Sequence, residues 1–173
     1  MISIKRATPS DHRAIVDIGT VAVAEAHKDS TTAENLNEYM VKHYNDDAIT
    51  KELENSNNIY HIIYVDDKPA GFSKIELNAE EPNIVTEHVT KLDRIYLVKE
   101  YFGLKLGYEL LKFNIDLAKN NDQSGMYLYT WTGNERAIAF YEKVGFKIIG
   151  SHKFKVTETH YNLNHLMFLD LKA

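Results

Sequence analysis

The spacing of apolar residues in the first third of the chain changes from two to a helical period. Alternation over residues 2–7 predicts a strand. The tetrapeptide Thr8-Pro9-Ser10-Asp11 then supplies an N-cap residue, a proline at the first helical position and an acidic residue at the third. A helix is therefore predicted from there to about Ala26, and a second helical region over roughly residues 33–54.

Strand signals dominate the middle of the chain. Residues 60–65 and 70–77 flank the turn sequence Asp66-Asp67-Lys68-Pro69 and predict a hairpin. The polar segment 80–89 contains a proline and predicts a connection, which leads to a further strand over residues 91–98.

From Leu104 the apolar spacing becomes helical again, which predicts a helix with one buried stripe formed by Leu106, Leu110, Phe113 and Leu117. The remaining predicted elements are a strand (126–131), a short helix (135–144) that ends at Gly145, and two strands (146–150 and 165–171). Strands and helices alternate only in the second half of this order. The pattern therefore predicts an α/β fold with a mixed sheet and helices on its faces, in a single domain over residues 1–173.

Composition removes several kinds of chemistry. The chain has no cysteine, which excludes disulfides, thiolate metal sites and a cysteine nucleophile. Its eight histidines form no closely spaced pair on one helix face, so no metal site is expected. The net charge of −5 disfavours nucleic acid and is compatible with cationic acceptors. Without a signal-peptide or membrane-span pattern, a cytoplasmic protein without a membrane partner is expected.

Residues 92–108 form the first segment with candidate chemistry. It reads as a strand, a short loop with Gly103 and Gly107, and the start of a helix. Unpaired N–H groups at a helix start attract anions, and glycine lets a pyrophosphate approach the backbone. An ordinary strand-to-helix turn fits the same residues equally well.

Residues 131–146 form the second such segment. Here Asn134 stands at the start of the predicted helix, and Tyr141 lies on the same helical face as Ala137. Each residue has a purely structural interpretation, because Asn134 can be a helix cap and Tyr141 a core aromatic residue.

The second segment resembles the signature of the GNAT (GCN5-related N-acetyltransferase) superfamily, Asn-x-x-Ala-x-x-Phe-Tyr-x-x-x-Gly-Phe, which is matched at Asn134, Ala137, Phe140, Tyr141, Gly145 and Phe146. The first segment resembles the pyrophosphate motif of that superfamily, Gln/Arg-x-x-Gly-x-Gly/Ala. The order of elements agrees along nearly the whole chain. Within the superfamily, Arg94-Ile95-Tyr96 and the run from Trp131 to Tyr141 look most similar to the PaiA-like spermidine/spermine N-acetyltransferases.

The resemblance implies a mixed, mostly antiparallel central sheet with two splayed central strands, and acetyl-CoA as the cofactor. The implied cofactor contacts are the backbone amides of Leu97 and Val98 at the thioester oxygen, the loop residues Phe102, Gly103, Leu104, Lys105, Leu106, Gly107 and Tyr108 at the pyrophosphate, and Asn134, Ala137, Tyr141 and Lys143. The implied reaction is direct attack by an uncharged amine, with Tyr141 as the acid that protonates the leaving thiolate.

The general base and the acceptor are less well defined by the resemblance. Asp93 is a candidate base, although a surface ion pair with Arg94 or a lysine is favoured for it, and Glu87, His160 or a chain of water molecules remain open. The rings of Trp131 and Tyr129 are candidates to stack on a cationic acceptor, or are core residues. The acceptor site is expected from residues 25–44 and 157–163, and the acceptor class is a polyamine or another small amine. A homodimer is compatible with the sequence.

One departure from the family pattern bears on activity. When Gly107 is aligned with the last glycine of the pyrophosphate motif, Phe102 replaces the usual Gln or Arg and Lys105 replaces the usual first Gly. Lys105 can add charge near phosphate or obstruct it. The alternative function is therefore a weak or inactive acetyl-CoA-binding module that acts as a sensor or interaction protein. A dinucleotide-binding domain is disfavoured because its G-x-G-x-x-G pattern is absent.

Overall fold

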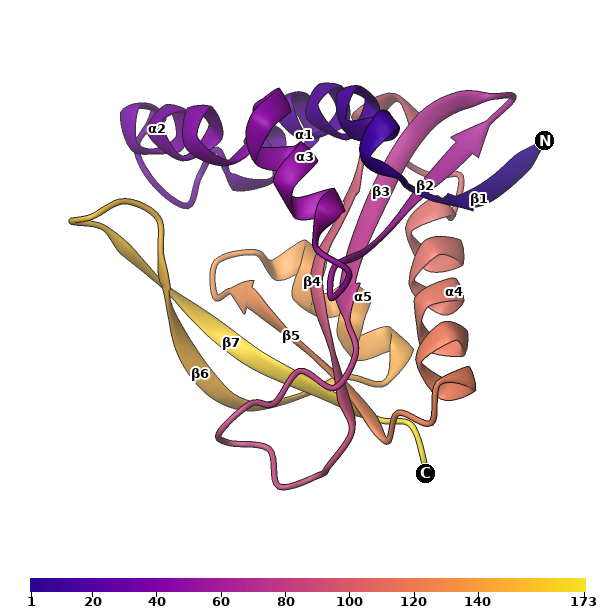
Figure 1. Ribbon diagram of the computed structural model, residues 1–173. Coiled ribbons are helices and arrows are strands. Elements are labelled where there is room, and N and C mark those ends of the chain that lie inside the picture. Colours follow the sequence, from indigo (N-terminus) through magenta and orange to yellow (C-terminus); the bar gives the residue numbers. More distant parts are fainter. The chain divides into compact units, whose positions relative to one another are not determined.

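The computed structural model describes residues 1–173 and has the predicted α/β architecture (Figure 1). Seven strands form a mixed, mostly antiparallel sheet in the order β1-β2-β3-β4-β5-β7-β6. The strands are β1 (Ile2–Arg6), β2 (Ile59–Val65), β3 (Lys68–Glu76), β4 (Val89–Leu97), β5 (Gly125–Trp131), β6 (Lys147–Lys155) and β7 (Tyr161–Asp170). The helices are α1 (His12–His27), α2 (Ala33–His43), α3 (Asp46–Glu54), α4 (Leu106–Asn120) and α5 (Glu135–Val144), with short 3-10 turns η1 (Pro9–Asp11) and η2 (Lys99–Tyr101).

Contacts between residues divide the chain into two compact units. Unit 1 comprises Met1–Ile75 with Arg94–Asn114, and unit 2 comprises Glu76–Asp93 with Ile115–Ala173. No helix in either unit combines the length and the apolar character needed to cross a membrane.

The strands of unit 1 pair as the sequence predicts. β1 and β2 are antiparallel, with Ile2 opposite Val65, and β2 and β3 form the predicted hairpin. Its turn residues Asp66 and Asp67 both have positive φ, 48° and 63°, as a two-residue hairpin turn of type I′ requires.

The first helical segment of unit 1 begins after Thr8, as predicted, but as the 3-10 turn η1 that leads into α1. Thr8 and Asp11 occupy the capping-box positions, and the backbone N–H of Thr8 donates to the Asp11 carboxylate at 2.7 Å. The single helical region predicted over residues 33–54 was wrong, because the chain forms two helices that separate at Tyr44. There the Asn45 side chain accepts a hydrogen bond from the N–H of Ala48 at 2.8 Å and caps α3.

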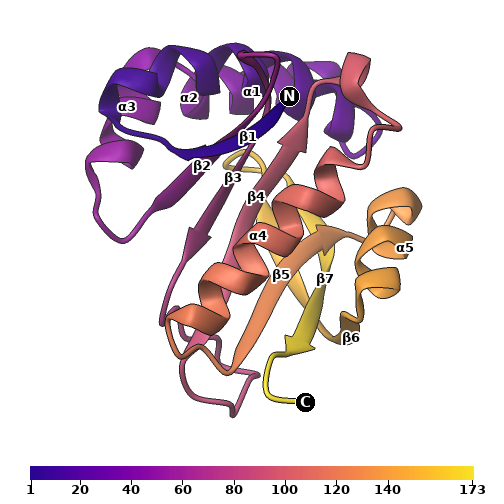
Figure 2. The ribbon, with the colours of Figure 1, turned by 90° about the vertical axis from the view of Figure 1, so that its right-hand side faces the viewer.

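Two apolar cores form on opposite faces of the unit 1 strands. The ribbon places α1 and α3 on one side of these strands and α4 on the other (Figures 1 and 2). On one face, residues of α1 and α3 pack against alternate residues of β2 and against Phe72 of β3. On the other face, Leu106 and Leu110 of α4 pack against Ile63 and Ala70. The face of β4 that carries Tyr96 belongs to the first core.

In unit 2, β5 is the central strand. Its parallel ladder with β4 covers three residue pairs, from Val89 opposite Gly125 to Lys91 opposite Tyr127. Its antiparallel ladder with β7 continues to Trp131 opposite Asn164. The far end of β5 is therefore paired with β7, whereas its ladder with β4 has already ended.

Two sequence boundaries in this half of the chain were inaccurate. The last two strands extend well beyond the predicted segments 146–150 and 165–171, because β6 and β7 form a long hairpin from Lys147 to Asp170 (Figure 1). Most residues of β6 are exposed, so the strand lacks the alternation of apolar residues on which its prediction depended. The helix α5 has the predicted bounds and ends at Gly145 in the left-handed conformation, φ 118°.

Candidate active site

The loop before α4 in unit 1 has the backbone of a glycine-containing anion loop. Gly103 has φ 87° and Lys105 has φ 59°, both in the left-handed region. The helix consequently begins at Leu106 and not at Leu104, because a left-handed residue cannot belong to the right-handed helix. Lys105 stands where the family motif has its first glycine, so this lysine keeps the backbone conformation that glycine normally provides.

The first turn of α4 supplies the donors for an anion. The first intrahelical bond of this turn runs from the N–H of Glu109 to the carbonyl of Lys105 at 3.1 Å. The N–H groups of the preceding helical residues, Leu106 to Tyr108, therefore have no helical acceptor and point out of the helix end. Leu106 is 1% exposed and fixes this turn to the core, whereas Phe102, Leu104 and Tyr108 are exposed.

The backbone of β4 in unit 1 distinguishes between the two predicted oxyanion donors. The N–H of Val98 donates to the carbonyl of Ala70 at 2.9 Å and is used by the sheet. Because N–H groups of successive strand residues point to opposite edges, the N–H of Leu97 points away from β3. Of the two predicted oxyanion donors, Leu97 is therefore the one whose backbone N–H is not directed toward β3.

The α1 face of β4 carries polar contacts that the sequence did not predict. The hydroxyl of Tyr96 lies 3.0 Å from Nε2 of His27, at the C-terminal end of α1. The guanidinium of Arg94 donates to the hydroxyl of Tyr60 at 2.9 Å. These partners are 69 and 34 residues apart, so no local pattern in the sequence announces either contact.

A buried ion pair accompanies Arg94 on this face. Lys74, 5% exposed, contacts the Glu52 carboxylate at 2.8 Å, and the same carboxylate accepts a hydrogen bond from Tyr60 at 3.0 Å. Burial opposes ionisation of Glu52, but Arg94 and Lys74 outweigh it and lower the pKa of the carboxyl group. Burial raises the pKa of Tyr60.

In unit 2, Asn134 is the N-cap of α5. Its Oδ1 accepts a hydrogen bond from the N–H of Ala137 at 3.1 Å, which is the structural role that the sequence left open. The side-chain NH2 group makes no hydrogen bond within the protein, so the cap leaves two donors for a ligand.

Tyr141 lies on α5 seven residues after Asn134, about two turns further along the helix. Its ring makes edge-to-face contacts with Phe140 and Phe146, at centroid distances of 5.3 and 5.7 Å, but its hydroxyl has no hydrogen-bond partner in the chain. The residue is half-buried, and burial raises the pKa of its phenol. The hydroxyl is therefore a protonated donor at neutral pH.

The two candidate stacking residues of β5 have different surroundings. Trp131 packs so closely on Gly133 that a Cβ atom at Gly133 would collide with the indole ring. Tyr129 stacks on His152 at a centroid distance of 4.1 Å, with the ammonium group of Lys91 5.6 Å from the centre of the tyrosine ring. Burial, followed by the charge and hydrogen bonding of Glu81, raises the pKa of Tyr129 to about 12.

Asp93 has the surface ion pair that the sequence favoured, because its carboxylate contacts the Lys91 ammonium group at 2.9 Å. The other residues named as bases are also in unit 2. Glu87 is exposed, and Nε2 of His160 lies 2.8 Å from Oδ1 of Asn162. Of the other predicted cofactor contacts, Ala137 is half-buried and Lys143 is exposed on α5.

The sequence matches the model of the acetyltransferase (GNAT) family over residues 20–146. An uncharacterised N-acetyltransferase in the pepI 3′ region of Lactobacillus delbrueckii subsp. lactis is 23% identical over 153 residues, 88% of each chain. The chain belongs to the GNAT acetyltransferase family. It is accordingly an acetyl-CoA-dependent N-acetyltransferase, as the motif resemblance predicted.

Solved structures agree with the fold of this acetyltransferase. The PaiA N-acetyltransferase of Thermoplasma acidophilum, in complex with coenzyme A, has a TM-score of 0.79 at 19% identity, covering 98% of this chain and 99% of that one. The ribosomal-protein-S18-alanine N-acetyltransferase of Escherichia coli has a TM-score of 0.72 at 17% identity, with 99% and 94% covered. An N-acetyltransferase of Staphylococcus aureus Mu50 has a TM-score of 0.73 at 20% identity, with 100% and 99% covered.

The residues of this acetyltransferase fit the chemical groups of acetyl-CoA. The left-handed backbone at Lys105 and the outward N–H groups of the first turn of α4 suit a pyrophosphate. The Asn134 NH2 group suits an amide carbonyl of the pantetheine arm, and the Tyr141 hydroxyl is a donor without a protein acceptor.

Proposed function

We propose that this acetyltransferase acetylates the primary amine of a small cationic molecule, with polyamines as the first acceptors to test, by direct attack of the amine on acetyl-CoA. The observation that carries the proposal is the Tyr141 hydroxyl, which is protonated, half-buried and unpaired in the chain. A donor of this kind is what a thiolate leaving group needs.

The cofactor contacts follow from the backbone of each unit. In unit 1, the first turn of α4 and the loop from Phe102 to Lys105 hold the pyrophosphate, and Lys105 adds a positive charge beside it. The Leu97 amide stabilises the negative charge that develops on the thioester oxygen. Val98 contributes packing in place of the predicted amide donor, since its N–H already donates to Ala70. In unit 2, Asn134, Ala137 and Lys143 of the α5 segment contact the cofactor.

Tyr141 supplies the proton for the departing sulfur. An isolated tyrosine has a pKa of about 10, and burial raises the pKa of this one, so the phenol keeps its proton until the C–S bond breaks. A free thiol has a pKa of about 8.5 and the phenol is the weaker acid, so the Tyr141 hydroxyl stays protonated and donates to the sulfur as negative charge develops on it.

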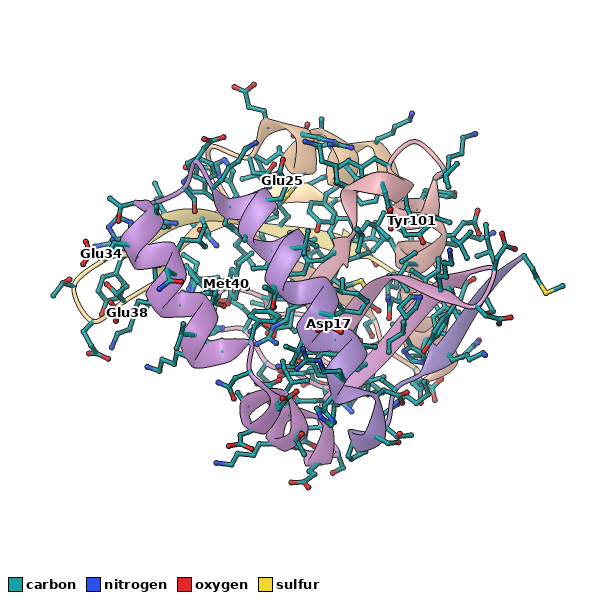
Figure 3. The ribbon with its side chains drawn as sticks, turned by 90° about the horizontal axis from the view of Figure 1, so that it is seen from above. Asp17, Glu25, Glu34, Glu38, Met40 and Tyr101 are labelled. Atoms are coloured by element: carbon teal, nitrogen blue, oxygen red, sulfur yellow. The ribbon has the colours of Figure 1, made fainter.

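The charge of the predicted acceptor segment supports a cationic acceptor. Residues 25–44 carry four acidic residues (Glu25, Asp29, Glu34 and Glu38) and two lysines. Figure 3 shows Glu25 on α1 and Glu34 and Glu38 on α2. In unit 2, the rings of Tyr129 and Trp131 are proposed to stack on the cationic acceptor, because the Tyr129 ring already has a lysine ammonium group 5.6 Å from its centre.

Substitution of Tyr141 by phenylalanine tests the acid. Purified protein is incubated with acetyl-CoA and a panel of polyamines, amino acids, aminoglycosides and peptide N-termini, and the release of free thiol is followed. We expect Tyr141→Phe to lower kcat by about 10- to 100-fold, because general acid catalysis is lost, and to leave the KM for acetyl-CoA within about twofold.

Tyr64→Phe is the matched control, since Tyr64 lies on β2 outside the proposed site. A Tyr141→Phe rate within about twofold of wild type would show that this phenol is not the acid. If wild-type protein binds coenzyme A but acetylates no amine in the panel, the chain is the inactive binding module and the proposed function is wrong.

A further inference from the structure

We propose that Tyr96 and His27 form the proton-accepting pair for the acceptor amine: the Tyr96 oxygen takes a proton from the ammonium group while its own hydroxyl proton passes to Nε2 of His27. The inference rests on the proposed function and adds the base that the sequence could not choose. Neither residue belongs to the signature over residues 134–146, although Tyr96 lies in the run Arg94-Ile95-Tyr96 that carries the PaiA-like resemblance, and both lie in unit 1.

The pair is adjacent to the proposed oxyanion donor. Tyr96 precedes Leu97 on β4, and its side chain lies on the face of the strand covered by α1. The amine must lose its proton close to the carbonyl carbon that it attacks, and the carbonyl oxygen is assigned to the Leu97 amide. Tyr96 directly precedes Leu97 on β4, so the backbone of the strand keeps this proposed base close to the amide that binds the carbonyl oxygen.

The contact between the two side chains is suited to proton transfer. The Tyr96 hydroxyl and Nε2 of His27 are 3.0 Å apart, and their rings meet edge to face with centroids 6.0 Å apart. Both residues are half-buried, so a bound amine can reach the hydroxyl while the imidazole is partly withdrawn from water. Burial lowers the pKa of His27, which leaves the ring neutral and able to accept a proton at pH 7.

The protons balance over the step. The ammonium N–H bond breaks and a bond to the Tyr96 oxygen forms, while the original Tyr96 O–H bond breaks and an Nε2–H bond forms on His27. The products are an uncharged amine, a neutral tyrosine and a charged imidazolium, which returns its proton to water after turnover. The step requires that His27 carries its resting proton on Nδ1.

The charged groups on the elements around the pair are mostly engaged with one another. Glu25 on α1 contacts Lys28 at 3.1 Å and Lys99 of η2 at 3.2 Å. Arg94, two residues before Tyr96 on β4, contacts Tyr60 and Glu52. On α2, the ring of His43 lies against that of Tyr39 at a centroid distance of 4.4 Å with a tilt of 40°, and the pKa of His43 is lowered by burial and by Arg94. Nε2 of His27 lies within hydrogen-bond distance of the Tyr96 hydroxyl, at 3.0 Å, and is the group that can take its proton.

The pH dependence of variant rates separates a proton relay from a structural role. The assay compares wild type with Tyr96→Phe and His27→Gln from pH 7 to 10. The control is His12→Gln, at the opposite end of α1. The acceptor is spermidine, or another amine of the panel if that amine reacts faster. We expect both pair variants to lose about 100-fold in kcat/KM at pH 7. Their deficit should shrink at least tenfold toward pH 10, where roughly a quarter of an alkyl amine with a pKa of about 10.4 is already uncharged, whereas His12→Gln stays near wild type throughout.

A deficit that stays constant with pH, or no deficit at pH 7, would overturn the relay. A second measurement does not depend on turnover. Nitrogen NMR of protein labelled at histidine reports the tautomer and the titration of His27, whose signals are assigned because they disappear in His27→Gln. We expect the Nδ1–H tautomer and a titration midpoint that changes in Tyr96→Phe. A resting proton on Nε2 would also overturn the relay, because His27 would then donate to Tyr96. Failure of wild type with every amine refutes the proposed function instead.

Discussion

The imidazole of His61 is buried without a partner for one of its nitrogens. The residue is 6% exposed, its ring meets Phe113 edge to face at 4.7 Å, and Nδ1 makes no hydrogen bond. Burial, with a smaller effect from the charge of Arg6, lowers its pKa to about 4. The folded protein therefore holds a neutral histidine that the unfolded chain would protonate near pH 6.5.

We predict that His61 makes the protein less stable as the pH falls from about 6.5 to 4. In that window the unfolded chain binds the proton and the folded chain does not, so the free energy of unfolding rises with pH and levels off below the folded pKa of about 4. Between pH 7 and pH 5 the loss from this residue is about 2 kcal/mol. Urea unfolding at both pH values measures it.

Between pH 7 and pH 5, His61→Gln should lose about 2 kcal/mol less free energy of unfolding than wild type. His88→Gln, which replaces an exposed histidine, is the control and should lose as much as wild type. Equal pH dependence in His61→Gln and wild type would contradict the prediction.

Lys105 occupies a backbone conformation that costs a non-glycine residue free energy. We predict that Lys105→Gly raises the free energy of unfolding by about 1 kcal/mol or slightly less, because φ is 59° there and glycine adopts this region without strain. Chemical denaturation measures the change. Calorimetry with coenzyme A measures whether the lost lysine charge weakens binding.

Lys105→Ala is the matched control, since it removes the charge and keeps the strain. A Lys105→Gly protein no more stable than Lys105→Ala would show that the loop relaxes away from the left-handed conformation.

At the scale of the elements, Gly19 lets α1 approach the ring of Tyr44 closely, because glycine has no side chain there. A Cβ atom added at Gly19 would collide with the ring of Tyr44, which is 6% exposed. We predict that Gly19→Ala destabilises the protein by about 1–3 kcal/mol through overpacking, although alanine favours a helix by about 1 kcal/mol over glycine. Thermal or urea unfolding checks the sign.

The same change in a Tyr44→Leu background is the control, because the smaller side chain leaves room for the methyl group. If Gly19→Ala costs the same in both backgrounds, the collision with Tyr44 is not the cause.

At the level of the elements, the sequence predicted the α5 helix to the residue and missed the break between α2 and α3. The bounds of α5 follow from signals inside it, the Asn134 cap and the left-handed Gly145. The break at Tyr44 depends on the burial of that ring in the core against α1, which helical periodicity does not report. Periodicity alone therefore joined two helices into one.

For the molecule as a whole, the net charge of −5 and the acidic residues of α1 and α2 should attract a cationic acceptor over some distance (Figure 3). We predict that the KM for spermidine rises several-fold between about 20 and 200 mM salt, because the screening length then falls below about 10 Å. Steady-state kinetics at constant pH measure the effect.

The double variant Glu34→Gln/Glu38→Gln should flatten this salt dependence, and the KM for acetyl-CoA serves as the internal reference in the same assays. A spermidine KM that is independent of salt would mean that long-range attraction plays no part in acceptor binding.

Apart from the break between α2 and α3, the sequence by itself determined the order of the elements, the cap positions Thr8 and Asn134, the family, and the placement of Asn134 and Tyr141 on one helical segment. All of these depend on residues within a few positions of one another, where spacing and backbone preference act directly. The tertiary structure decided which polar groups remain for chemistry. It commits the Val98 amide to Ala70, and it joins His27 to Tyr96 across 69 residues. Such contacts arise only when packed elements bring distant side chains within hydrogen-bond distance.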